Sequence, residues 1–203
     1  MPLFPLQVVL FPGAELPLHI FEERYKEMIG EVLRDRKEFG VVLASEKGVV
    51  NTGCTATVDK VLRRYPDGRL DILTLGRRRF EILLLNDERP FLRGAVEFFD
   101  DDASSPVPPE IHKLAVDGYN EMRQLFTSEP LAAGESGATQ LSFKLAQPVP
   151  DLALRQLILS TRSEAERMRH LASFFPGYLQ KQRRVQRIKE LAPRNGHGPA
   201  SAQ

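Results

Sequence analysis

The pattern of apolar positions divides the chain into an amino-terminal half typical of strands and a carboxy-terminal half typical of helices. In the first hundred residues, short runs rich in β-branched and aromatic side chains end at Gly or Pro, which predicts β-strands. The expected strands are Leu3–Leu10, Phe39–Ala44, Cys54–Tyr65, Arg69–Leu75, Arg79–Leu85 and Leu92–Phe99. Between two of them, Pro66-Asp67-Gly68 predicts a tight turn in which Gly68 has a left-handed backbone conformation.

One amphipathic helix interrupts the predicted sheet. Its apolar positions recur at helical spacing, and charged residues fall between them, so one face is expected to be buried. These positions are Phe21, Tyr25, Met28, Ile29, Val32 and Leu33. We expect this helix to cover an open end or a face of the sheet, with Ile29 at the centre of the buried stripe.

The composition changes abruptly near residue 100, where an acidic stretch rich in Ser and Pro predicts a linker. Helical periodicity follows over residues 111–126, 139–146, 151–159 and 163–175, and a basic helix is expected over 178–191. Residues 129–136 are expected to form a loop. Pro176-Gly177 is expected to kink or break the last helix.

Strands followed by helices indicate an α+β fold. The expected organisation is a β-rich subdomain over residues 1–100, a linker over 101–109, a helical subdomain over 110–192 and a disordered tail over 193–203.

Composition places the chain among globular proteins, with 42% hydrophobic and 27% charged residues in 203 positions. No apolar run reaches the ~18–20 residues that a membrane-spanning helix needs, so no membrane association is expected. The first residues lack the basic region of a secretory signal, and the single Cys54 cannot form an internal disulfide. These features favour a cytoplasmic location.

The sequence contains none of the motifs that would identify an enzyme. The phosphate-binding patterns G-x-x-x-x-G-K-[ST] and G-x-G-x-x-G are missing, as is the nucleophile elbow G-x-S-x-G. The four histidines lie in separate segments without metal-ligand spacing, and Cys54 lies in a strand pattern where a lone cysteine is usually a buried apolar residue. We therefore expect no catalytic residue, no metal and no cofactor.

Charge is distributed unevenly along the chain. Residues 155–194 hold ten Lys or Arg against three Glu, a net charge of +7, which leaves −6 for residues 1–154 of a chain whose total is +1. Such a basic end either has an acidic partner or forms a solvated helix.

The candidate binding residues are basic and aromatic positions of the β-rich half. They are Arg63, Tyr65, Arg77 and Arg79. Regular strand alternation places Arg77 and Arg79 on one face, with Arg78 and Phe80 on the other. The cluster is then a binding patch or a strand edge protected by charge. Nucleic-acid binding there is not expected, because this half is acidic, Trp is absent and aromatic residues do not alternate with the arginines.

Several ordered motifs resemble the amino-terminal, substrate-binding domain of Lon proteases, especially its free-standing bacterial versions. The motifs are Leu3-Phe4-Pro5-Leu6, Val8-Val9-Leu10-Phe11-Pro12-Gly13, Leu16-Pro17-Leu18-His19-Ile20-Phe21-Glu22-Glu23-Arg24-Tyr25, Phe39-Gly40-Val41-Val42, Gly76-Arg77-Arg78-Arg79-Phe80-Glu81-Ile82 and Leu141-Ser142-Phe143-Lys144-Leu145-Ala146. The chain departs from the family at Glu23, where Pro is frequent, and at Pro176-Gly177 in the last helix.

The resemblance implies a PUA-like β pseudobarrel with one inserted helix, followed by a helical bundle. It also implies a non-catalytic module that binds unfolded protein or peptide segments in protein quality control, without the ATPase and protease modules of Lon. An RNA- or anion-binding module is the alternative, because PUA-like barrels elsewhere bind RNA and the carboxy-terminal segment is basic. A third reading, an enzyme, requires a deep pocket that contains His19, Cys54 or Arg79 beside a carboxylate.

Overall fold

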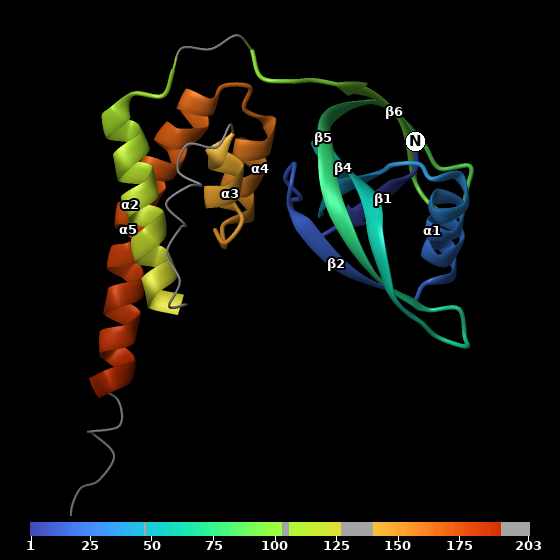
Figure 1. The fold of residues 1–203 in the computed structure, drawn as a ribbon, viewed down its shortest axis with the longest axis horizontal. Coiled ribbons are helices and arrows are strands. Elements are labelled where there is room, and N and C mark those ends of the chain that lie inside the picture. Colours follow the sequence, from blue (N-terminus) through green and yellow to red (C-terminus); the bar gives the residue numbers. More distant parts are fainter. Residues whose placement is uncertain (47, 103–105, 127–139, 192–203) are drawn as a thin grey trace, which may run out of the picture. The chain divides into compact units, whose positions relative to one another are not determined.

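The structure is a computed structural model that describes residues 1–46, 48–102, 106–126 and 140–191. The described residues form two compact units (Figure 1). The first contains residues 1–46, 48–102 and 140–164, and the second contains residues 106–126 and 165–191. The expected loop at 129–136 and the expected tail at 193–203 lie outside the described residues.

A six-stranded sheet forms the centre of the first unit. Its strands are β1 (Leu3–Leu6), β2 (Glu15–Ile20), β3 (Phe39–Ser45), β4 (Gly48–Arg64), β5 (Leu70–Asn86) and β6 (Arg93–Phe98). They follow the order β1-β3-β4-β5-β2, and β6 also pairs with β5. The β1–β3 pair is parallel and all other pairs are antiparallel. The predicted α+β class is confirmed.

The long strands β4 and β5 form a curved hairpin (Figure 1). Their register shifts at three places, and such bulges bend a strand and increase its twist. The sequence pattern predicted two strands where β5 is continuous, and it missed β2. Strand β2 contains Pro17, a residue that sheets tolerate chiefly in edge strands and that weakens a strand prediction.

Helix α1 (Glu23–Asp35) buries Tyr25, Met28, Ile29 and Val32, so the predicted core position of Ile29 is confirmed. Phe21 does not belong to this buried stripe. It precedes the helix, because the N-cap residue Glu22 still has an extended backbone, and its side chain is 59% exposed.

Two short helices, α3 (Leu141–Ala146) and α4 (Leu152–Ser160), belong to the unit that contains the sheet. The Phe143 ring stacks on Phe11 at 5.6 Å between centroids, and Arg155 donates to the Val9 carbonyl at 2.6 Å. The sequence-based organisation had grouped both helices with the rest of residues 110–192. Periodicity predicts that these segments are helical, but it does not specify the layer against which they pack.

The second unit is built from α2 (Pro109–Phe126) and α5 (Glu164–Leu191). The two helices approach closely at Gly118, where an added Cβ would lie 2.5 Å from the Phe175 Cβ. Of the kink or break expected at Pro176-Gly177, the break does not occur, because α5 continues through Pro176. Proline removes one helical hydrogen bond. Packing of the buried Phe175 and Leu179 on either side of it offsets this loss.

Candidate functional site

The buried cysteine is unsuited to catalysis. Cys54 is fully buried in β4, and burial raises the pKa of its thiol to about 12, so the nucleophilic thiolate does not form near neutral pH. Among the residues that the structure describes, no three His, Cys, Asp or Glu side chains are grouped as metal ligands. Within the same residues, no helix is both long and apolar enough to cross a membrane.

Arg79, one of the predicted binding residues, is buried and only 3% exposed. Its guanidinium donates to the carbonyls of Leu159 at 3.2 Å and Thr161 at 2.8 Å, and to Asp101 Oδ1 at 2.5 Å. These bonds connect β5 to the end of α4 and to the segment after β6. In this structure Arg79 therefore connects parts of the first unit and is not available to a ligand.

A β-bulge explains why Arg79 and Arg77 do not share a face. The register shifts between Cys54 and Ala56, and the Arg78 amide donates to Thr55 Oγ1 at 3.0 Å. The extra residue leaves Arg77 and Arg78 both exposed, followed by two buried residues, so regular alternation was the wrong expectation here.

The reading of the arginines as a protected strand edge does not hold at Arg79. Arg79 pairs with Cys54 of β4 on one side, and its carbonyl accepts the Phe99 amide at 3.3 Å on the other. Arg77 remains exposed and donates to Thr57 Oγ1 at 3.0 Å.

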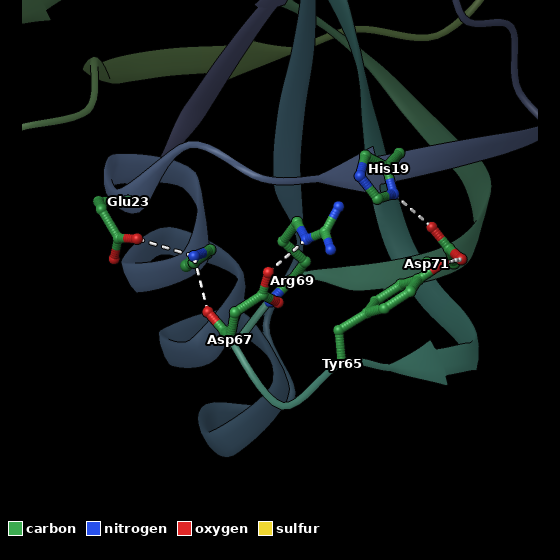
Figure 2. A network of polar contacts seen from close by, with 7 residues as sticks. His19, Glu23, Tyr65, Asp67, Arg69 and Asp71 are labelled. Carbon is green, nitrogen blue, oxygen red and sulfur yellow. Dashed lines mark hydrogen bonds and ion pairs between the residues drawn. The ribbon is translucent and has the colours of Figure 1, made fainter.

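Arg63 and Tyr65 belong to a group that we call the tyrosine cluster, which gathers side chains from β2, β4, β5 and the β4–β5 turn. Its members are His19, Arg63, Tyr65, Arg69 and Asp71. Figure 2 shows the members His19, Tyr65, Arg69 and Asp71. The register places both Arg63 and His19 opposite Asp71. The Tyr65 hydroxyl donates to Asp71 Oδ2 at 2.8 Å, and His19 Nδ1 lies 2.6 Å from Asp71 Oδ1.

The electrostatics of the tyrosine cluster keep Asp71 charged and Tyr65 protonated. The hydrogen bonds from His19 and then from Tyr65 lower the pKa of Asp71, because they stabilise its carboxylate. Donation to the same carboxylate raises the pKa of Tyr65. The guanidinium groups of Arg63 and Arg69 lie over the Tyr65 ring, 4.6 Å and 4.8 Å from its centroid.

The β4–β5 turn is held beside α1. Lys26 of α1 donates to Glu23 Oε1 at 2.7 Å and to the Asp67 carbonyl at 3.0 Å (Figure 2). Arg69 Nε donates to Asp67 Oδ2 at 2.7 Å, and no ion pair within the described ranges joins Arg63 to a carboxylate. Arg63 is therefore an exposed cation whose charge is not neutralised by a salt bridge.

A groove of mixed polarity begins next to His19, between the end strands β1 and β2 of the sheet order. Its volume is about 200 Å³; Leu18 and Phe21 contribute apolar surface, and Glu22 and Arg24 line it with charged groups. The Phe21 ring stacks on His19 at 5.9 Å between centroids, which joins the groove to the tyrosine cluster. Small-molecule pockets usually measure ~300–1,000 Å³, so this groove suits apolar side chains better.

The structure thus brings together two of the four predicted binding residues, Arg63 and Tyr65. Arg77 lies six positions beyond Asp71 along β5, which is about 20 Å at the rise of a strand. Sequence reasoning named His19 only for an enzyme pocket beside an unspecified carboxylate and missed Asp71, because only the pairing of β2 with β5 brings the two together.

Comparison with known proteins identifies the class. Residues 1–183 match the family model of the ATP-dependent protease La (LON) substrate-binding domain, and the chain belongs to this family. The crystal structure of a Lon N-terminal domain protein from Xanthomonas campestris is similar over 87% of this chain and 98% of that one, with a TM-score of 0.70 and 26% identity. The N-terminal domain of the Mycobacterium avium complex Lon protease has the same fold, with a TM-score of 0.60, 16% identity, and coverage of 86% and 97%.

Relatives at the level of sequence are complete Lon proteases. That of Roseiflexus castenholzii is 28% identical over 189 residues, which is 86% of this chain and 23% of the relative. That of Parabacteroides distasonis is 30% identical over 123 residues, which is 56% of this chain and 15% of the relative. The chain therefore spans less than a quarter of each of these two proteases. The family predicted from the motifs is confirmed.

Proposed function

We propose that this chain is a non-catalytic module that binds extended apolar segments of unfolded proteins or peptides. The observation that carries the proposal is the groove between β1 and β2, where the exposed Phe21 joins it to the tyrosine cluster, in a chain of a substrate-binding family. We assign the binding roles to Arg63 and Tyr65, as predicted, and add Phe21.

The chemistry of this surface suits a polypeptide ligand. Phe21 is 59% exposed although it is a large aromatic residue, and such anchors contribute most of the binding energy when a partner covers them. Each fully buried apolar side chain of a ligand contributes ~1.5–3 kcal/mol, so two or three anchors supply about 3–9 kcal/mol before the entropic cost of association. Micromolar affinity is therefore the upper limit for this surface, and weaker binding is expected. Arg63 is positioned to pair with a ligand carbonyl or carboxylate.

The RNA-binding alternative has one supporting observation, because Tyr65 and two guanidinium groups offer a stacking surface with nearby positive charge. Salt dependence separates the two ligands. Two phosphate contacts to a single strand predict an affinity loss of about sevenfold between 50 and 200 mM salt. Capture of an apolar peptide is expected to change little, because burial of apolar surface is not screened by ions.

The test measures fluorescence anisotropy with a labelled peptide rich in Phe and Leu, and with a labelled single-stranded RNA, at both salt concentrations. We expect peptide binding that Phe21→Ser and Tyr65→Ala each weaken at least about fivefold. Leu114→Ser is the matched control, since Leu114 is 56% exposed and lies in α2 of the other unit. Equal affinity for wild type and Phe21→Ser would overturn the site, and tighter, salt-sensitive RNA binding would favour the alternative function.

A further inference from the structure

The carboxy-terminal end of β5, from Ile82 to Asn86, has a strand neighbour on one side only among the described residues. Pairing with β4 ends at the Thr52–Glu81 pair, whereas pairing with β6 continues to the Asn86–Arg93 pair. We call this segment the β5 edge. It leaves backbone hydrogen-bonding groups available to an added strand.

The direction of one backbone unit at this edge follows from the pairing. The Gly94 amide donates to the Met1 carbonyl at 3.0 Å and therefore points away from β5. Residues opposite each other in an antiparallel pair either exchange both hydrogen bonds or both point outward. Leu85 lies opposite Gly94, so its amide and carbonyl point away from β6, toward the unpaired side.

Three consecutive leucines make the β5 edge apolar. Leu83 is 65% exposed, Leu84 is 68% exposed and Leu85 is 45% exposed. The register with β6 shifts between Ile82 and Leu84, so Leu83 is the extra residue of a bulge, and regular alternation applies only from Leu84 to Asn86. An exposed apolar strand edge without Pro or charge is a ready template for another strand.

Other edges of the same sheet are protected. Strand β1 contains Pro5 and β2 contains Pro17, and these two strands are the ends of the sheet order. Proline cannot donate a ladder hydrogen bond and so hinders strand addition. Pro protects these two edges, whereas the β5 edge has a bulge at Leu83 and then an unprotected stretch from Leu84 to Asn86 without Pro or charge, which is where a partner strand can pair.

The charges beside the β5 edge indicate the chemistry of that partner. A hollow of about 570 Å³ is lined by Leu84, Glu88, Arg89 and Arg93, among others. Arg89 is engaged with Glu27 at 3.2 Å and with Glu31 of the same helix at 3.5 Å. The Arg93 guanidinium has no ion pair or side-chain hydrogen bond within the described part of the chain, and Glu88, which lines the same hollow, has no ion pair there either. An incoming carboxylate therefore pairs with Arg93 only if it lies away from Glu88.

We infer that the β5 edge binds an extended apolar peptide segment that carries an acidic residue, by adding it as a strand to the sheet. Backbone hydrogen bonds at Leu85 orient the segment, the leucines contact its apolar side chains, and Arg93 pairs with its Asp or Glu. The inference rests on the proposed binding of polypeptides and adds a second surface to it, apart from the groove between β1 and β2.

The experiment uses the whole chain and a labelled extended peptide in which Leu and Val alternate with Ser, with one Asp at an end. We expect the amides of residues 82–86 to gain protection from hydrogen exchange when peptide is added. An N-methylated version of the peptide is expected to bind at least tenfold more weakly, because it lacks alternate backbone donors. Both measurements use wild-type protein, so they do not depend on the folding of a variant.

Two variants test the side chains. Leu84→Glu is expected to weaken binding about tenfold, since Leu84 is largely exposed and its loss leaves the fold intact. Arg93→Glu is expected to reverse the preference, so that a peptide with Lys in place of Asp binds more tightly than the original. Phe21→Ser, which alters only the groove, is expected to leave protection of residues 82–86 unchanged.

The outcomes separate this inference from the proposed function. If peptide binding is insensitive to N-methylation and gives the amides of residues 82–86 no protection, the β5 edge is not a binding site, and the proposed binding at the groove is unaffected. No binding of any peptide overturns both. A dimer in sedimentation experiments that Leu84→Glu dissociates identifies a second copy of the chain as the occupant and likewise overturns the inference.

Discussion

Replacing Arg79 tests whether this residue stabilises the fold, as its buried position in the structure indicates, or binds a ligand, as the sequence predicted. The side chain is almost fully buried, its guanidinium donates to Leu159, Thr161 and Asp101, and it lies over the Phe99 ring at 4.6 Å. Truncation leaves Asp101, whose side chain is 18% exposed, without this ion pair. Removing one partner of a buried pair typically costs ~3–5 kcal/mol, and a buried unsatisfied acceptor adds to that loss.

We therefore expect Arg79→Ala to lower the free energy of unfolding by about 3–5 kcal/mol. Arg77→Ala is the matched control two positions away, and its exposed side chain predicts a change within about 0.5 kcal/mol. Urea denaturation followed by circular dichroism measures both. Unchanged stability of Arg79→Ala together with weaker peptide binding would refute this reasoning and return Arg79 to the binding site.

Three further predictions follow from local features. Ile29→Ala is expected to lower the free energy of unfolding by ~2–5 kcal/mol because Ile29 is fully buried, whereas Gly30→Ala, whose added methyl meets nothing within 4 Å, is expected to raise it by ~0.5–1 kcal/mol. The melting temperatures of the two variants should therefore shift in opposite directions. If Ile29→Ala instead lost peptide affinity without losing stability, Ile29 would not be a core residue. Gly68→Val is expected to cost roughly 1–2 kcal/mol because Gly68 has a φ of +83°, and an unchanged urea midpoint would show that this backbone is not strained by a side chain. Hydrogen bonds lower the folded-state pKa of Asp71, so the stability that this carboxylate contributes is present above the unfolded pKa and is lost as the pH falls through the lower folded pKa. Asp71→Asn is therefore expected to show a smaller fall of the urea midpoint below about pH 4 than the wild type. The same fall in both proteins would show that the hydrogen bonds of Asp71 do not stabilise the fold.

Features that depend on neighbours in the chain were predictable from the sequence. The buried position of Ile29 follows from helical spacing, and the left-handed backbone of Gly68 follows from the turn motif; the structure confirms both. The ordered motifs also identified the family. These features need only local periodicity, turn geometry or the order of residues along one chain.

The position of Arg79 could not be predicted in this way, because a bulge depends on the partner strand. A single extra residue reverses the face of every later side chain in a strand. The insertion occurs opposite Thr55, more than twenty positions earlier, whose hydroxyl accepts the Arg78 amide. Nothing within residues 77–80 alone signals this event.

The same limit applies to the candidate site and to the division into units. Arg63 and Tyr65 were selected from their own hairpin, and their binding role stays a prediction. His19 joins them because β2 pairs with β5, and α3 joins the sheet because Phe143 stacks on Phe11. The sequence by itself determined which segments are helices or turns and which family the chain belongs to. Only the tertiary structure decided which faces meet, because strand register and helix docking are set by contacts between residues far apart in the chain.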